Sequence, residues 1–446
     1  MFKALDNNPR LFEQMVPADA DSYVGVALVA RGLVFGGVAM WRRTGAEAFS
    51  EQDEKLLVEI ASRAALSIDN ARRYTREHAA VVALQRSLLP TTATDTSGAR
   101  TEGVYVPTVS SAGVGGDWFD VIPLSSARIA LVVGDIMGHG LRATAAMGRL
   151  RAAVHTLADL DLPPDELLAH LDDIVCRLGD DDPDDPLSAT CLYAVWDPVT
   201  RRCSLASAGQ PPPALVRPSG TVEFLDVSPG PPLGVGGVPF EMTHTDLPPG
   251  SVLALYTDGL IEYGNDIDAG MTELCERLVS LHASEEDLGE SAHRIVCEIC
   301  PTPSSDDIAL LLARIRCVPS DNVATWEIPA DPAAVAVARA LVSQQLTTWA
   351  LADTVLTAEL VVSELVTNAI RYGSPPIVLR LIREHTLICE VSDTSSTQPR
   401  LRRARWNDEG GRGLFLIAQM TDRWGSRYTP TGKTIWTEQP LTGTPF

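Results

Sequence analysis

Residues 114–140 read VGGDWFDVIPLSSARIALVVGDIMGHG, where the apolar β-type run IALVVGDI brings an aspartate, Asp135, to its end beside glycine. Asp117 stands in a matching context just before the run WFDVI. The same context recurs at Asp258 in YTDGLIE and at Asp306 in SSDDIALLL. A carboxylate at a strand end projects beyond the sheet, and small neighbours allow a ligand to approach closely. One Asp-Gly alone is usually only a turn, but four matching aspartates predict a site for Mg²⁺ or Mn²⁺.

The rest of this region alternates between two kinds of pattern. Short β-rich runs (IALVVGDI, ATCLYAVW, SVLALYTDG, DIALLLARI) are interrupted by helical stretches near residues 141–178 and 271–300. This alternation predicts an α+β fold in which sheets are flanked by helices. After a short linker near Cys317, a second pattern follows: a strand, helices at 332–349 and 353–372, and further strands.

The ordered set GGDWFD, VGDIMGHG, SATCLYAVWDP, ASAGQPPPALV, YTDGLIE and DDIALLL resembles the SpoIIE branch of the protein phosphatase 2C superfamily. The resemblance implies a β-sandwich flanked by helices and a metal-dependent serine/threonine phosphatase with two Mn²⁺ or Mg²⁺ ions. By that resemblance, the metal ligands are Asp117, Asp135, Asp258 and Asp306, with the backbone carbonyl of Ile136 as a further candidate. Two ions would lower the pKa of a bound water, which would attack a phosphoserine or phosphothreonine without a covalent intermediate.

The C-terminal part contains a second group of motifs. Glu364 and Asn368 lie four residues apart in ELVVSELVTNAIRYG and so share one helix face. LICEVSD then leads to Asp393, and EGGRGLFLIAQM opens a helix behind glycines suited to wrapping phosphate. With TGKTIW, this order resembles the GHKL ATPase fold in its anti-sigma-factor kinase branch, an α/β sandwich.

That second resemblance implies roles for several of these residues in binding ATP with Mg²⁺. Asn368 would coordinate the Mg²⁺, Glu364 would act as general base, and Asp393 would accept the adenine amino group, while Gly411, Arg412 and Gly413 would contact the phosphates. Relatives commonly have glycine two residues after the aspartate, where this chain has Ser395. If the loop needs a positive φ there, we expect slow kinase turnover.

The N-terminal part predicts a β-hairpin over residues 23–43, turning at Arg31-Gly32, and then a helix that begins with a capping box at Ser50 and Asp53 and stops before Pro90. The hairpin and the helix start resemble the C-terminal half of a GAF sensor domain. A whole domain of that kind is about twice as long, so either its front has been lost or the start codon lies inside the gene. The apolar positions along this helix fit two arrangements equally: pairing with a second copy as a homodimer, or packing on its own domain.

Charge and cysteine content indicate which kinds of partner the protein has and where in the cell it works. A net charge of −22 argues against nucleic acid as a partner. Eight cysteines without a disulfide pattern, no signal peptide and no apolar run long enough to span a bilayer predict a cytoplasmic protein with no membrane partner.

These patterns predict four parts: a partial GAF-like segment over 1–75, a connector helix over 76–95, the phosphatase domain over 96–318 and the ATPase domain over 322–446. The leading hypothesis is a phosphatase acting on a phosphorylated anti-sigma-factor antagonist, a small STAS-type protein, with a kinase-like domain for the same class of partner. The alternative is a partner-switching binding protein that sequesters a sigma factor or antagonist through its ATPase domain.

Overall fold

The computed structural model describes residues 19–88, 93–108, 115–138, 141–179, 187–262, 266–282, 287–301, 306–396, 413–429 and 431–441. The chain divides into two compact units, Met1–Leu84 and Gln85–Phe446. No helix in these ranges is both long and apolar enough to cross a membrane.

The first unit contains one hairpin and the first part of one helix. β1 (Ala20–Ala30) pairs antiparallel with β2 (Leu33–Arg43), and the turn residues Arg31 and Gly32 have φ values of 48° and 82°. The predicted hairpin is therefore confirmed. Helix α3 runs without a break over Glu51–Leu88. The capping box is also confirmed, because the Ser50 amide donates to the Asp53 carboxylate at 2.8 Å and the Asp53 amide donates to Ser50 Oγ at 3.2 Å.

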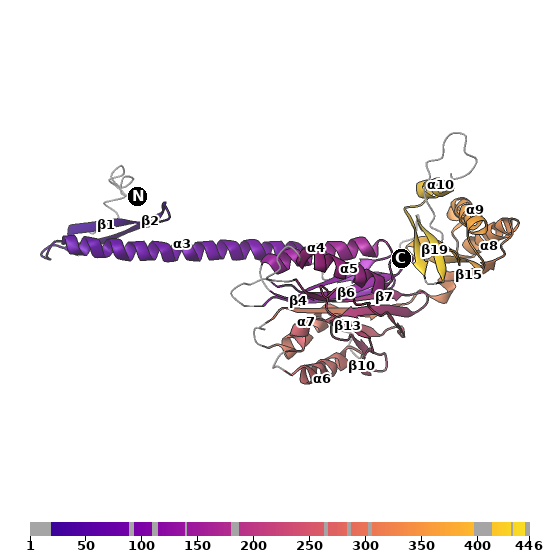
Figure 1. The fold of residues 1–446 in the computed structure, drawn as a ribbon, viewed down its shortest axis with the longest axis horizontal. Coiled ribbons are helices and arrows are strands. Elements are labelled where there is room, and N and C mark those ends of the chain that lie inside the picture. Colours follow the sequence, from indigo (N-terminus) through magenta and orange to yellow (C-terminus); the bar gives the residue numbers. More distant parts are fainter. Residues whose placement is uncertain are drawn as a thin grey trace. The chain divides into compact units, whose positions relative to one another are not determined.

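The second unit contains two six-stranded sheets between residues 93 and 315 (Figure 1). One has the order β10 (Val222–Phe224), β9 (Ala214–Val216), β13 (Val252–Tyr256), β14 (Ile308–Ile315), β4 (Ala99–Val106), β3 (Ala93–Asp95). The other has the order β11 (Pro229–Gly230), β8 (Arg202–Ala208), β7 (Ala189–Asp197), β6 (Ile129–Ile136), β5 (Trp118–Pro123), with β12 (Thr243–Asp246) also paired to β8. The four predicted β-runs are β6, β7, β13 and β14.

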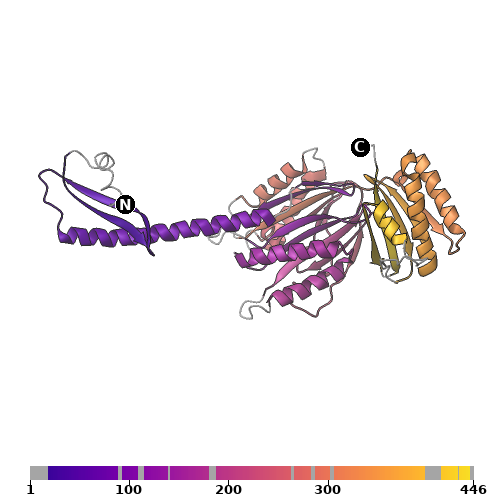
Figure 2. The same ribbon diagram turned by 90° about the horizontal axis from the view of Figure 1, so that it is seen from above.

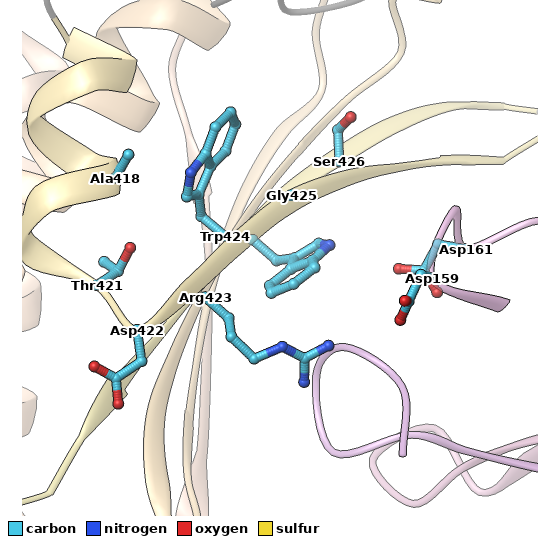
Figure 3. Close-up of a pocket in the computed structure, with 10 residues that line it drawn as sticks. Asp159, Asp161, Ala418, Thr421, Asp422, Arg423, Trp424, Gly425 and Ser426 are labelled. Carbon is cyan, nitrogen blue, oxygen red and sulfur yellow. The ribbon is translucent and has the colours of Figure 1, made fainter. Parts of the chain in front are cut away.

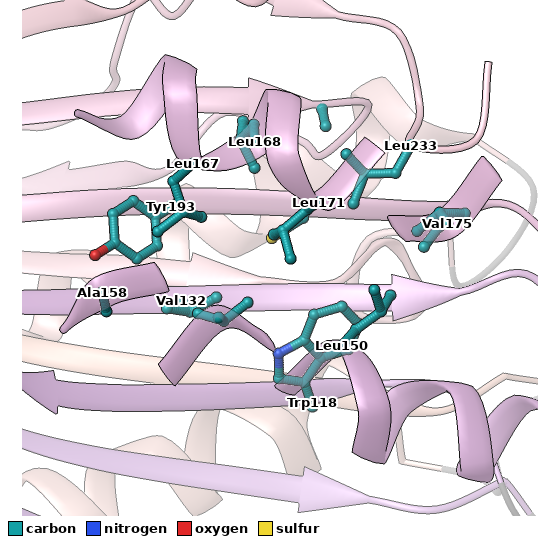
Figure 4. Packing of buried hydrophobic residues seen from close by; sticks show 14 of the residues in the cluster. Trp118, Val132, Leu150, Ala158, Leu167, Leu168, Leu171, Val175, Tyr193 and Leu233 are labelled. Atoms are coloured by element: carbon teal, nitrogen blue, oxygen red, sulfur yellow. The ribbon is translucent and has the colours of Figure 1, made fainter. Parts of the chain in front are cut away.

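Alternation along β6 explains the layers. Ile129, Leu131 and Val133 pack in a core with residues of β13 and β14, so the two sheets form a sandwich. Ala130 and Val132 point the other way, into a core with Trp118 and with helices α4 (Leu141–Ala158) and α5 (Pro164–Gly179) (Figure 4). The outer face of the other sheet packs on α6 (Ile267–Leu278) and α7 (Leu288–Ile299). Short 3-10 turns cover Asp258–Leu260 and Val279–His282.

The C-terminal part is a second α/β sandwich. Its sheet has the order β15 (Val323–Ile328), β16 (Ile377–Arg383), β17 (Thr386–Asp393), β19 (Gly432–Pro440), β18 (Arg423–Thr429). Helices α8 (Ala334–Thr348), α9 (Val355–Tyr372) and α10 (Gly413–Met420) pack on one face (Figure 2). Short 3-10 turns cover Ser320–Asn322 and Ala352–Thr354. The predicted fold class, a flanked β-sandwich followed by an α/β sandwich, is confirmed.

Candidate metal centre and nucleotide site

The four predicted aspartates lie at matching ends of strands from both sheets of the sandwich. Asp117 precedes β5 and Asp135 lies near the end of β6, and these two strands are paired through Trp118 and Gly134. Asp258 follows β13 and Asp306 precedes β14, which are also paired. Strand ends of the two sheets therefore bring acidic side chains to one edge of the sandwich.

Asp117 and Asp135 form the buried half of this group. Asp117 is 1% exposed, and Thr257 Oγ1 donates to its Oδ2 at 2.6 Å. Burial and the neighbouring Asp135 carboxylate raise the pKa of Asp117 well above its usual range. Burial raises the pKa of Asp135 from 3.8 to about 6, although its hydrogen bond with Asp117 lowers it, and Asp258 and Asp306 add to the rise. Burial and mutual repulsion therefore disfavour the charged form of both carboxylates when no cation is near.

Asp258 and Asp307 experience the same repulsion. Burial raises the pKa of both, and the Asp306 carboxylate raises both further. Among the described residues, no Lys or Arg forms a salt bridge with either of them, or with Asp117 or Asp135. A buried carboxylate without a cationic partner is costly, and a bound cation would remove that cost.

Asp307 is buried beside this group, although the resemblance implies that Asp306 and not Asp307 is the ligand. Asp307 is 1% exposed, its Oδ1 accepts the Thr108 amide at 2.7 Å, and its Oδ2 is buried with no hydrogen-bond partner in the described structure. A Cβ built on Gly115 would fall 0.9 Å from that Oδ2, so glycine is required there. Burial against a glycine far away in the chain is invisible in the sequence, where the two aspartates are simply adjacent.

The Ile136 carbonyl lies close to the backbone next to Asp117. A Cβ on Gly116 would lie 2.4 Å from the Ile136 carbonyl oxygen, so this carbonyl lies against the residue that precedes Asp117. As they are placed, no three His, Cys, Asp or Glu side chains within the described ranges are arranged to hold an ion. The donor set is nevertheless the all-oxygen chemistry that Mg²⁺ and Mn²⁺ require, and its repulsion is the kind that a cation relieves.

The nucleotide-site candidates lie on α9 and at the end of β17. Glu364 and Asn368 are half-buried on one face of α9, whereas Leu365 and Val366 on the other face are buried in the core. Asp393 is 4% exposed at the end of β17. A Cβ on Gly373, the residue after α9, would lie 2.6 Å from Asp393 Cγ, so the end of α9 meets the end of β17. Gly411 and Arg412 lie outside the described residues, and Gly413 is the first residue of α10.

Lys433, which stands in the motif TGKTIW but was given no role from the sequence, contacts one of these candidates. Its Nζ donates to Asp393 Oδ1 at 2.9 Å and to the Ser395 carbonyl at 3.3 Å, and both charged side chains are buried. The Ser395 amide donates to the same Oδ1 at 2.8 Å, which leaves Oδ2 without a hydrogen bond among the described residues. The sequence did hold a signal for this position. Residues two apart on a strand point to the same face, so Lys433 shares with Ile435 the face of β19 that the helices cover.

The expectation of slow kinase turnover depended on a positive φ at Ser395, and the structure does not show one. Ser395 is not among the described non-glycine residues with positive φ. The loop therefore accepts a Cβ at this position in the conformation described here, and the expected strain is absent.

Comparison with known proteins assigns both parts. Residues 125–316 match the family model of stage II sporulation protein E (SpoIIE), and residues 328–438 match the model of the histidine kinase-like ATPase domain. These matches place a SpoIIE-like region before a histidine kinase-like ATPase region, in the order that the two resemblances implied. Neither match includes the GAF-like segment.

Individual relatives match parts of the chain. It is 25% identical over 154 residues to "Phosphoserine phosphatase RsbP" of Bacillus subtilis (strain 168), and this alignment covers 34% of this chain but only 38% of that protein's length. The RsbU and RsbW domains of a Mycobacterium tuberculosis protein are 24% identical with a TM-score of 0.46, covering 78% of this chain and 95% of that one. The phosphatase domain of Bacillus subtilis SpoIIE is 17% identical with a TM-score of 0.42, covering 50% and 65%.

Proposed function

We propose that this protein is a metal-dependent protein serine/threonine phosphatase, with residues 96–318 as its catalytic domain and residues 322–446 as an ATP-binding domain. Residues 76–95 would connect these to the GAF-like segment 1–75. The observation that carries the proposal is the cluster of buried carboxylates from both sheets, which no basic side chain of the described structure neutralises. Such a cluster is costly unless it serves to bind cations.

The chain's own residues suggest how the site works. Asp117, Asp135, Asp258 and Asp306, with the Ile136 carbonyl, would hold two Mn²⁺ or Mg²⁺ ions. Ions bound there would supply a hydroxide at neutral pH for attack on a phosphate ester. Thr257 orients Asp117 through its 2.6 Å hydrogen bond, and its hydroxyl also accepts the Ala309 amide at 2.9 Å, which fixes it between β13 and β14. Asp307 would stay behind the ligands, orienting the Thr108 backbone.

The substrate we propose is a phosphoserine or phosphothreonine of an anti-sigma-factor antagonist of the STAS type. The support is the likeness to a phosphoserine phosphatase and the presence of a histidine kinase-like ATPase domain on the same chain. A sigma factor is the second partner we propose.

For the ATPase domain, we propose that Asn368 holds the Mg²⁺ of ATP, that Glu364 is the general base and that Asp393 accepts the adenine amino group through its Oδ2. Gly411, Arg412 and Gly413 would contact the phosphates. Lys433 supports this interpretation, because it fixes the Asp393 carboxylate in one orientation.

We also propose a homodimer formed through α3 and the hairpin. Large apolar side chains of this unit are exposed, and these include Leu33, Val34, Leu56, Val58 and Ile60, between 51% and 63% exposed. Exposed apolar side chains in this number favour burial against a partner. Light scattering on the purified protein tests this, and a monomer at micromolar concentration would contradict it.

The competing function is a binding protein that sequesters a sigma factor or antagonist, with inactive catalytic sites. Mn²⁺-dependent hydrolysis of p-nitrophenyl phosphate separates the two functions. An enzyme gives turnover that EDTA removes, whereas a sequestering protein gives none and instead retains its partner in an ATP-dependent pull-down.

A further inference from the structure

The turn between β5 and β6 is buried, which is unusual for a hairpin tip. The Ser125 carbonyl accepts the Arg128 amide at 3.3 Å, and the two central residues, Ser126 and Ala127, both have φ of 62°. Neither is glycine, so the left-handed backbone costs about 1 kcal/mol or more at each. Ser126 is nevertheless only 2% exposed. Contacts beyond the hairpin must hold the tip in place.

Those contacts come from the sheet of the ATPase domain. The Ser126 amide donates to Glu438 Oε1 of β19 at 3.1 Å, and Arg427 of β18 donates from Nη1 to Ser126 Oγ at 2.9 Å. Beside them, Ala127 packs against the buried residues Val318, Ile382 and Ile388. The tip therefore meets the sheet face that lies opposite α8, α9 and α10.

A buried charge network extends the contact into the sheet. Arg427 donates from Nη2 to Glu390 Oε1 at 2.6 Å, and Arg380 donates from Nε to Glu390 Oε2 at 2.5 Å. Burial alone would raise the pKa of Glu390, which is 1% exposed, but Arg427 and Arg380 lower it to about 2. Glu390 thus stays ionised, and its partner Arg427 is the residue that reaches the phosphatase hairpin. Three strands of the ATPase sheet are joined to Ser126 in this way.

The linker is part of the same contact. Val318 is 4% exposed, and its amide donates to the Pro198 carbonyl of the phosphatase domain at 3.1 Å. On the other side, the Ser125 hydroxyl of the hairpin tip donates to Asp161 Oδ2 at 2.6 Å. Asp161 and Asp159, in the turn between α4 and α5, line a pocket of about 470 Å³ together with Arg423, Trp424 and Ser426 of the ATPase sheet (Figure 3). None of the proposed site residues lines that pocket. Both domains therefore contribute side chains to one continuous seam.

The hairpin also leads to the candidate metal centre. Asp117 directly precedes β5, and Asp135 is six residues along the chain from Ile129, the first residue of β6. At about 3.3 Å per residue, the tip and the carboxylates are separated by about 20 Å of paired strand. On the ATPase side, Asp393 lies three residues after Glu390 on β17. The contact between the domains thus joins β17, which carries Asp393 of the candidate nucleotide site, to the β5–β6 hairpin, which carries Asp117 and Asp135 of the candidate metal centre.

We propose that the β5–β6 hairpin docks the phosphatase domain onto the open face of the ATPase sheet within one chain, so that the two domains unfold as one body and a ligand of either stabilises both. The linkage part of this proposal rests on the proposed function, because it needs Mn²⁺ and nucleotide as ligands. A ligand that binds one member of a cooperative pair raises the stability of the whole pair.

Ser126→Arg tests the docking, because it places a cation against Arg427 at a tip that lies outside both proposed sites. Ser219→Arg is the matched control, since Ser219 lies at the exposed turn between β9 and β10. Ser126→Ala is the milder variant, which removes only the hydroxyl that Arg427 contacts. Differential scanning calorimetry of the full chain is run with EDTA, with Mn²⁺ and with a non-hydrolysable ATP analogue.

We expect the wild type and Ser219→Arg to unfold the Gln85–Phe446 unit in one transition, which both ligands shift upward. In Ser126→Arg we expect two transitions, each shifted by only one ligand, and in Ser126→Ala one transition at a lower temperature. Two independent transitions in the wild type, or an unchanged single transition in Ser126→Arg, would overturn the proposal. If neither ligand shifts any transition, ligand binding and thus the proposed function has failed, while the number of transitions still decides whether the domains are docked.

Discussion

Replacing Asp135 with asparagine should stabilise the metal-free protein at neutral pH while removing phosphatase activity. In the folded protein, burial and the acidic neighbours raise the pKa of Asp135 from 3.8 to about 6. A group whose pKa is raised by folding favours the folded state below its unfolded pKa, and this contribution is lost as pH rises through the folded value. The metal-free wild type should therefore lose stability between about pH 4 and pH 7.

The difference between 3.8 and about 6 corresponds to about 3 kcal/mol once the pH exceeds the higher value. An asparagine side chain cannot ionise, so the Asp135→Asn variant avoids this cost and should melt about 5 °C higher than the wild type at pH 7.5 in EDTA. At pH 4.5, which is closer to the unfolded value of 3.8, the difference should shrink to about a third of this. Mn²⁺ should reverse the order at pH 7.5, because it stabilises only the protein that keeps the carboxylate.

Thermal melts at the two pH values, with EDTA or Mn²⁺, measure this directly. Asp173→Asn on the exposed face of α5 is the control and should follow the wild type in all four conditions. Equal pH dependence of the wild type and Asp135→Asn in EDTA would refute the proposed repulsion. Equal stabilisation of both by Mn²⁺ would refute the role of Asp135 as a ligand.

Further substitutions test the other assignments. Asp258→Asn should lower Mn²⁺-dependent turnover by about 100-fold or more with an unchanged circular dichroism spectrum, since a lost ligand removes several kcal/mol of transition-state stabilisation; near-wild-type turnover at saturating Mn²⁺ would contradict this. Asn368→Ala should weaken Mg²⁺·ATP binding in calorimetry and leave phosphatase activity in nucleotide-free buffer unchanged; loss of both in a folded protein would contradict separate sites. Lys433→Met should cost about 3 kcal/mol of stability and weaken ATP binding, because it leaves the buried Asp393 carboxylate unpaired; unchanged ATP affinity would remove Lys433 from the site. Ser395→Gly should leave ATP affinity within about twofold, because the described backbone needs no positive φ there; a large gain would show that the loop adopts another conformation when it closes.

The sequence predicted the elements whose patterns are local. The hairpin turn at Arg31-Gly32, the capping box at Ser50 and the four apolar runs that became β6, β7, β13 and β14 all follow from residues close together in the chain. Strand-end aspartates could be singled out for the same reason, since each is marked by its immediate neighbours.

Features that depend on contacts across the fold could not be predicted in this way. Nothing near Asp307 indicates that its Oδ2 would be buried against Gly115, about 190 residues away. Lys433 reaches Asp393 from 40 residues further along the chain. The contact of Ser126 with Arg427 joins residues 301 apart in the chain. Each of these pairs is set by sheet order, which no local pattern encodes.

Phosphate release from a phosphoserine-bearing STAS protein tests the central claim most directly. The purified full chain should release phosphate with Mn²⁺, the release should stop with EDTA, and it should return when excess Mn²⁺ is added. Phosphate release that is unaffected by EDTA, or no release from any phosphoserine substrate at saturating Mn²⁺, would contradict a metal-dependent phosphatase built on these carboxylates.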